Sequence, residues 1–202
     1  MIKTVIFDLG NVIVPFDFKR GYRGIAPHCA YAPEEIPKRI GQTDLVIRLE
    51  SGQIEPRDFH AELARLLEMR TTYDQFCDIW SSIFLPHTLI PDQVIEGISK
   101  RYRLLLLSNT NAIHFAMLKD AYPTLRHFHH KVLSHEVGAM KPAELIYADA
   151  VKHSGVNPEE CFFTDDVLPY VEGARKYGID AEQFLGFDKL AEDLAARGIR
   201  WE

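Results

Sequence analysis

The sequence predicts an α/β fold, a Rossmann-like parallel sheet with helices on both faces and a small helical domain inserted after the first strand. Short runs of β-branched, aromatic and leucine residues alternate with segments of helical periodicity, which is typical of parallel sheets covered by helices. Between the first two strands, by contrast, the patterns are helical only. That stretch is too long to be a loop, so we expect it to form a domain of its own.

Five strands are expected, because five short apolar runs have the length and composition of buried strands. They cover residues 2–7 (IKTVIF), 102–107 (YRLLLL), 131–134 (KVLS), 161–164 (CFFT) and, with a weaker pattern, 180–186. Helical patterns follow the last four strands, at residues 111–122, 143–155, 168–178 and 188–198. Gly155 and Gly178 stand at the ends of two of these helices, where glycine favours termination.

The stretch from residue 16 to residue 90 contains the helical insertion. Phe59, Leu63 and Leu67 share one face at helical spacing, and Pro56 suits the first turn of that helix. A second amphipathic pattern runs through residues 76–84. We therefore expect a core domain formed by residues 1–15 and 91–202, and a helical domain formed by residues 16–90.

Composition and charge narrow the class of partner. The 202 residues carry a net charge of -6, so no basic surface for nucleic acid is expected. No apolar run reaches membrane-spanning length, and Asp8 interrupts the N-terminal apolar run, so neither a membrane partner nor a signal peptide is expected. The three cysteines are widely spaced, which argues against a disulfide framework or a zinc site and fits the cytoplasm.

Polar residues that can carry chemistry follow four of the expected strands. In open α/β sheets ligands bind beyond the carboxyl ends of the strands, so these residues are expected to share one rim. They are Asp8 after the first strand, Ser108 and Asn109 after the second, Lys141 after the third, and Asp165 and Asp166 after the fourth.

This set of residues suits hydrolysis of a phosphate ester. A carboxylate can attack phosphorus and form an acyl phosphate, provided that a cation offsets its repulsion of the phosphoryl oxygens. Mg²⁺ prefers carboxylate, carbonyl and water oxygens, which Asp8, Asp165 and Asp166 would supply in part. A hydroxyl and backbone amides at a helix start suit phosphate oxygens, and a lysine adds positive charge beside the nucleophile.

Four stretches resemble the motifs of the haloacid dehalogenase (HAD) superfamily, in order and over nearly the whole chain. They are VIFDLGNV, LLLLSNTN, GAMKPAELIY and FFTDDVLPYVEGA. Within the superfamily the chain looks closest to the FDLGNV-type phosphatases, a group that includes an α-D-glucose-1-phosphate phosphatase. The resemblance implies that the helical region 16–90 is a C1 cap inserted into the core.

The resemblance also implies roles for the rim residues. Asp8 would be nucleophile and metal ligand, the Gly10 carbonyl would lie near the metal, and Lys141 would be the catalytic charge clamp. Ser108 and Asn109 would bind the phosphate, while Asp165 and Asp166 would complete the metal site. The cofactor would be Mg²⁺, and the substrate a small phosphorylated metabolite such as a sugar 1-phosphate.

The chain departs from the pattern of the superfamily at three positions. Most of its phosphatases have a second aspartate two residues after the nucleophile, which protonates the leaving oxygen and later activates water. Gly10 can do neither, and general acid–base help is worth about 10²–10⁴-fold. Another group or water must do this work, and Gly10→Asp is expected to restore it if the loop tolerates the side chain. Val167 and Tyr170 replace polar residues expected to support the metal.

Two alternatives remain open from the sequence. A 2-haloacid dehalogenase would use the aspartate on carbon without a metal, although Asp165 and Asp166 would then repel a carboxylate substrate. A degenerate, non-catalytic binding module is suggested by Gly10, Val167 and Tyr170. Metal dependence separates the first alternative from a phosphatase, and an Asp8→Asn variant that keeps its function would indicate the second. The sequence leaves the oligomeric state open.

Overall fold

A five-stranded parallel sheet forms the centre of the molecule, in a computed structural model that describes all 202 residues. The strand order is β3-β2-β1-β4-β5, with every neighbouring pair parallel. The strands are β1 (Thr4–Phe7), β2 (Arg103–Ser108), β3 (His130–Leu133), β4 (Cys161–Asp165) and β5 (Asp180–Gln183). Each expected strand overlaps an observed one, so the predicted α/β fold with a parallel sheet is confirmed.

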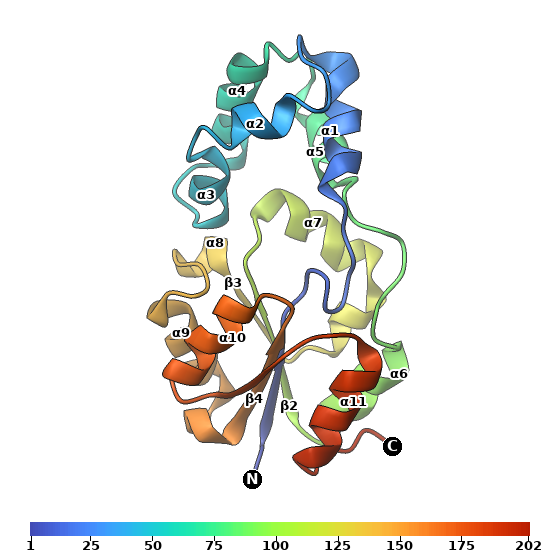
Figure 1. Cartoon of the computed structure of the whole chain (residues 1–202), viewed down its shortest axis with the longest axis vertical. Helices are drawn as coiled ribbons and strands as arrows, with labels where there is room; N and C mark the ends of the chain where they lie inside the picture. Colours follow the sequence, from blue (N-terminus) through green and yellow to red (C-terminus); the bar gives the residue numbers. More distant parts are fainter.

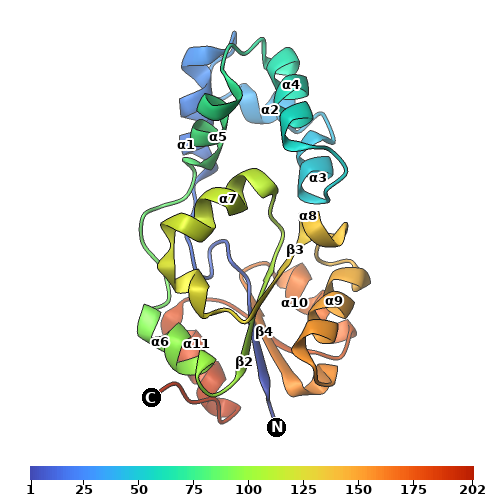
Figure 2. The same ribbon diagram turned by 180° about the vertical axis from the view of Figure 1, so that it is seen from behind.

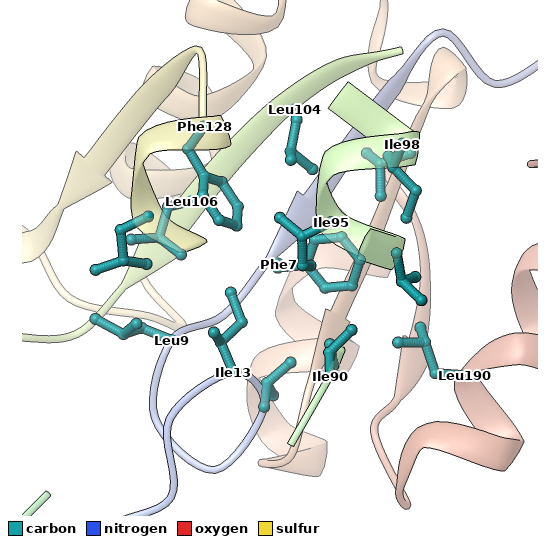
Figure 3. Close-up of a cluster of buried hydrophobic side chains, with 14 of the residues drawn as sticks. Phe7, Leu9, Ile13, Ile90, Ile95, Ile98, Leu104, Leu106, Phe128 and Leu190 are labelled. Carbon is teal, nitrogen blue, oxygen red and sulfur yellow. The ribbon is translucent and has the colours of Figure 1, made fainter. Parts of the chain in front are cut away.

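Helices cover both faces of the sheet because successive side chains of a strand point to opposite faces. Val5 and Phe7 of β1 point to the face covered by α6, α7 and α11, whereas Ile6 points to the face covered by α9 and α10. Figures 1 and 2 show the two helical layers, and Figure 3 shows Phe7 among apolar side chains on the face covered by α6, α7 and α11. These helices are α6 (Asp92–Ser99), α7 (Ala112–Ala121), α9 (Glu144–Ser154), α10 (Leu168–Lys176) and α11 (Phe187–Ala196).

Between β1 and α6 the chain forms only helices and connecting turns, apart from isolated bridges. Five α-helices lie here: α1 (Phe18–Ile25), α2 (Ile36–Ile40), α3 (Leu45–Glu50), α4 (Pro56–Leu67) and α5 (Tyr73–Ser81). They gather at the end of the molecule opposite both termini (Figure 1). Buried side chains of these helices and their connections form a hydrophobic cluster that, together with Ile113 of α7, has 13 residues.

Local sequence explains where several of these helices begin. Thr72 and Gln75 form a capping box at the start of α5, and the Asn111 side chain accepts a hydrogen bond from the backbone N–H of His114 at the start of α7. Pro56 occupies the first turn of α4, where a missing N–H costs nothing. Two helices were not expected from the sequence: α6, and the single turn α8 (Ser134–Val137) after β3.

The carboxyl ends of the strands point toward the helical group α1–α5, as the path of β1 from the N-terminus shows in Figure 1. The residues that follow β1, β2 and β4 therefore lie between the sheet and these helices. Every helix of the chain is too short or too polar to cross a lipid bilayer.

Candidate active site

Lys141 holds the carboxylates of Asp8 and Asp165 together at the rim of the sheet. Its Nζ donates to Asp8 Oδ1 at 2.6 Å and to Asp165 Oδ2 at 2.5 Å. The third hydrogen bond of the ammonium goes to the backbone carbonyl of Leu107, at 3.0 Å. All three donors of this buried lysine are thus used, and its position is fixed by three different strands or strand ends.

A third carboxylate completes the acidic cluster. Carboxylate oxygens of Asp8, Asp165 and Asp166 lie within 4.8 Å of one another. With all three ionised and Lys141 protonated, three negative charges face one positive charge, so the cluster has a surplus of two negative charges. One divalent cation would balance this surplus, and carboxylate oxygens are the ligands that Mg²⁺ prefers. The donor set therefore fits Mg²⁺.

The acid–base properties of the cluster lead to the same conclusion. Burial raises the pKa of Asp8 to about 7, with Lys141 opposing the rise and Asp165 adding to it. Burial, and then the neighbouring Asp165, also raise the pKa of Asp166. Burial disfavours the ammonium of Lys141, but the two carboxylates outweigh it and raise the pKa of Lys141. A bound cation would favour the ionised form of the carboxylates, which a nucleophile requires.

Asn109 anchors the loop that carries Lys141. Its side-chain Oδ1 accepts from the backbone N–H of Lys141 at 2.8 Å, and its Nδ2 donates to the backbone carbonyl of Lys141 at 3.1 Å. The side chain expected on phosphate is therefore occupied, whereas the backbone N–H of Asn109 donates no hydrogen bond within the protein. Ser108, the last residue of β2, is buried, and both residues line the cavity described below.

Val167 and Tyr170 support the site in ways that their side-chain types do not suggest. The backbone N–H of Val167 donates to Asp165 Oδ1 at 2.8 Å, so the carboxylate is held without a polar side chain at this position. The ring centroid of Tyr170 lies 5.3 Å from Lys141 Nζ, within the range of a cation–π interaction. The two departures from the polar pattern thus leave Asp165 and Lys141 with defined partners.

Asn11 is a site residue that the sequence analysis missed. Its Nδ2 donates to Asp166 Oδ2 at 3.4 Å, and its Oδ1 accepts from the backbone N–H of Phe16 at 3.3 Å. Asn11 has a φ of 54°, in the left-handed region that asparagine tolerates better than most residues. An asparagine directly after Gly10 was the available signal, since this pair is typical of a tight turn.

Gly10 has no room for a side chain. A Cβ on Gly10 would lie 2.7 Å from Cε1 of Phe16, closer than carbon atoms approach without displacement. Phe16 in turn packs edge-on against Phe18 and Phe84, with ring centroids 4.9 and 6.1 Å away. An aromatic ring thus occupies the space beside residue 10, so restoring an acid by Gly10→Asp requires Phe16 to move.

We expect Gly10→Ala to destabilise the fold by about 1–3 kcal/mol, the usual cost of overpacking. In a Phe16→Ala background the same substitution is expected to cost much less, because the clashing ring is gone. A double-mutant cycle measured by urea unfolding tests this coupling. Equal costs in both backgrounds would show that Phe16 does not limit residue 10.

A cavity of about 210 Å³ lies over the acidic cluster. The rim contributes its polar lining, which includes Asp8, Ser108, Lys141 and Asp166. Residues 16–90 contribute a mostly apolar lining with one acid: Phe16, Phe18, Glu50, Ile83 and Phe84. The cavity is therefore charged at the sheet and largely apolar on the opposite side.

His114 of α7 lines the same cavity but is held as a neutral structural residue. Its Nε2 lies 3.1 Å from the backbone carbonyl of Trp80 and so donates to it, and its Nδ1 accepts from the side-chain amide of Asn111 at 3.1 Å. Burial lowers the pKa of His114 to about 4. Because both ring nitrogens are used, His114 connects α7 to α5 and adds no positive charge to the cavity.

Comparison with known proteins identifies related enzymes. A family model of haloacid dehalogenase-like hydrolases matches residues 2–178. D-Ribitol-5-phosphate phosphatase of Bacteroides thetaiotaomicron is 28% identical over 190 residues, which cover 91% of this chain and 92% of that protein. A phosphatase of Mycobacterium tuberculosis is 26% identical over 186 residues, which cover 89% of this chain and 86% of that one.

A solved structure supports the same relationship. A HAD family enzyme from Bacteroides thetaiotaomicron, crystallised as its magnesium complex, superposes with a TM-score of 0.79 at 26% identity. The match covers 91% of this chain and 93% of that one. A particular likeness to α-D-glucose-1-phosphate phosphatase, which the FDLGNV motif suggested, stays a prediction.

Proposed function

The chain belongs to the haloacid dehalogenase-like hydrolase family and is a phosphoric monoester hydrolase, and we propose that it is a Mg²⁺-dependent phosphatase acting through an aspartyl-phosphate intermediate. The substrate would be a small phosphorylated metabolite. The observation that carries the proposal is the buried ammonium of Lys141 between Asp8 and Asp165, beside the third carboxylate of Asp166.

In the proposed reaction the chain's own residues position the phosphate and supply the nucleophile. Asp8 attacks phosphorus, and Lys141 keeps its carboxylate in place while offsetting negative charge near it. Ser108 and the unpaired backbone N–H of Asn109 suit phosphoryl oxygens that enter the cavity. Water then releases inorganic phosphate from the phosphorylated aspartate and restores Asp8.

Asp8, Asp165 and Asp166 would hold the Mg²⁺, together with the carbonyl of Gly10. When bound, the ion neutralises charge between the carboxylates and the phosphoryl oxygens. The magnesium complex of the related HAD enzyme supports this assignment. We place the metal site at the floor of the cavity and treat residues 16–90 as the cap that closes it.

The walls of the cavity favour a leaving part without negative charge. Lys141 is the only lysine or arginine that lines the cavity, and its ammonium is already bonded to two carboxylates. A second phosphate or a carboxylate on the substrate would therefore find no counterion in this cavity. Sugar and polyol monophosphates fit this requirement, and the related ribitol-5-phosphate phosphatase supports that class. We include both sugar 1-phosphates and pentitol 5-phosphates in it.

The free thiols bear on the cellular setting of the protein. Cys29, Cys77 and Cys161 are all free, as expected in a reducing compartment. We propose that the enzyme acts in the cytoplasm on a diffusible small molecule.

Removal of the metal tests the proposal. We expect a chelator to abolish phosphate release from a panel of sugar and polyol phosphates, and added Mg²⁺ to restore it. Asp166→Asn is expected to raise the Mg²⁺ concentration for half-maximal activity by at least about 10-fold, since even weaker disturbances of metal sites cost that much. Asp188→Asn, an exposed acid on α11, is the control. Full activity in excess chelator would instead favour a metal-free reaction of the dehalogenase type.

A further inference from the structure

Glu50 places a carboxyl group on the cap side of the cavity that contains Asp8 and Gly10. It is the last residue of α3, is half-buried, and is the only acid that residues 16–90 contribute to the cavity. It also lines a smaller adjoining cavity of about 110 Å³, whose walls include Phe18 and Trp80. A substrate whose phosphate lies on the rim would extend its leaving part toward this side.

The end of α3 is held in place by a close backbone contact. Gly52 has a φ of +67°, and a Cβ there would lie 2.2 Å from the carbonyl oxygen of His135. Only glycine permits both the turn and this approach, so the end of α3 packs directly against α8. Because α8 directly follows β3, this contact holds Glu50, two residues before Gly52, near the carboxyl end of that strand.

Glu50 has no partner in the protein. Its side chain forms no hydrogen bond and no ion pair, whereas the side chain of Arg48, two residues earlier, forms ion pairs with Asp44 and Glu62. A carboxyl group that is partly buried without a cation is costly to ionise and is free to act on a ligand. The titratable groups that line a cavity together with Glu50 are Tyr22 of α1, His114 of α7 and, on the rim side, Asp8, Lys141, Asp166 and Tyr170. The helices α4 and α8, which pack against α3, carry Glu62, His135 and Glu136.

The other titratable groups of the cavity already have a proposed catalytic or metal-binding role, or a contact within the protein. Asp8 is the proposed nucleophile, and Lys141 uses all three of its donors. Asp166 belongs to the metal cluster, and both ring nitrogens of His114 are bonded. Tyr170 packs its ring on the ammonium of Lys141. Glu50 is therefore the remaining carboxyl group of the cavity that can supply a proton, which Gly10 beside the nucleophile cannot do.

We propose that Glu50 is the general acid and base of the reaction, an inference that rests on the phosphatase function proposed above. As Asp8 attacks, the bond between phosphorus and the leaving oxygen breaks, and the carboxyl proton of Glu50 passes to that oxygen. A water molecule then attacks the phosphorus of the phosphorylated Asp8 and gives its proton to the Glu50 carboxylate. The bond between Asp8 and phosphorus breaks, which releases inorganic phosphate and restores both side chains.

The ionisation of Glu50 suits this role at neutral pH. Burial raises the pKa of Glu50 to about 7, near the operating pH at which an acid–base catalyst is most effective. The first step needs the protonated form. For a poor leaving group, kcat/KM is therefore expected to fall as the pH rises above about 7.

The test uses Glu50→Gln, which keeps the size of the side chain but removes its titration. Phenyl phosphate and p-nitrophenyl phosphate differ little in size but greatly in leaving-group acidity. On phenyl phosphate we expect kcat/KM to fall by about 10²–10⁴-fold, and on p-nitrophenyl phosphate by much less. The alkaline fall of the phenyl phosphate profile should also disappear. The matched control is Glu55→Gln, an exposed glutamate of the same helical group that lies outside the cavity.

The outcomes separate this inference from the function on which it rests. An equal loss on both esters, or no loss, in a folded Glu50→Gln variant would overturn the role of Glu50. In that case the activity of the unmodified protein and its dependence on Asp8 would stand. No phosphate release by the unmodified protein on either ester or on the sugar and polyol phosphate panel, or release that survives Asp8→Asn, would instead overturn the phosphatase proposal.

Discussion

Replacing Asp8 with asparagine is expected to abolish phosphate release while the protein stays folded. Asparagine keeps the size of the side chain and an oxygen that can accept from Lys141 Nζ, but it removes the nucleophile. Loss of a group that forms the covalent bond costs on the order of 10⁴–10⁶-fold in kcat where such groups act as a unit. Release of inorganic phosphate from p-nitrophenyl phosphate with Mg²⁺ measures the effect.

Two comparisons make the result specific. Far-UV circular dichroism and urea unfolding should show that Asp8→Asn is folded, and Asp188→Asn should keep full activity. Activity near the unmodified level in Asp8→Asn would contradict the mechanism, because Asp8 could not then be the nucleophile. No phosphate release by the unmodified protein would instead favour the non-catalytic binding module.

Replacing Lys141 with methionine is expected to have the largest effect on stability. The side chain is similar in length, but Asp8 and Asp165 lose the ammonium that lies between them. Removing one partner of a buried charge pair costs about 3–5 kcal/mol, because the remaining charge is left uncompensated. Urea unfolding in the presence of a chelator measures the loss. Phosphate release should also be lost.

Added Mg²⁺ separates the electrostatic cause from a simple packing defect. Because the carboxylates of Lys141→Met lack their ammonium, Mg²⁺ should raise the melting temperature of this variant more than that of the unmodified protein. Lys152→Met, at an exposed lysine of α9, should change neither stability nor metal response. A loss below about 1 kcal/mol would show that Lys141 does not neutralise the buried acids.

The sheet and the residues of its rim could be predicted because each depends on a short stretch of sequence. Buried parallel strands read as short apolar runs, and their carboxyl ends meet at one edge, so the sequence alone was enough to place Asp8, Lys141 and Asp165 together. The structure adds the contacts: one ammonium between two carboxylates, at 2.6 and 2.5 Å.

The cap side of the cavity could not be predicted from the sequence. Glu50 lies 42 positions from Asp8, at the end of a short, mostly apolar helix whose sequence does not single out its glutamate. Its approach to the cavity depends on the packing of α3 against α8, for which Gly52 was the only local sign. The role of Phe16 could not be predicted either, because a single aromatic residue after a strand does not reveal that it fills the space beside Gly10.

The most direct test of the central claim is to identify the phosphorylated residue during turnover. The enzyme is mixed with p-nitrophenyl phosphate and Mg²⁺, quenched in acid, reduced with borohydride and analysed by peptide mass spectrometry. Reduction converts an aspartyl phosphate to homoserine, so we predict homoserine at position 8, dependent on substrate and absent from Asp8→Asn. Turnover without homoserine at position 8, or with the modification on another residue, would contradict the assignment of Asp8 as the nucleophile.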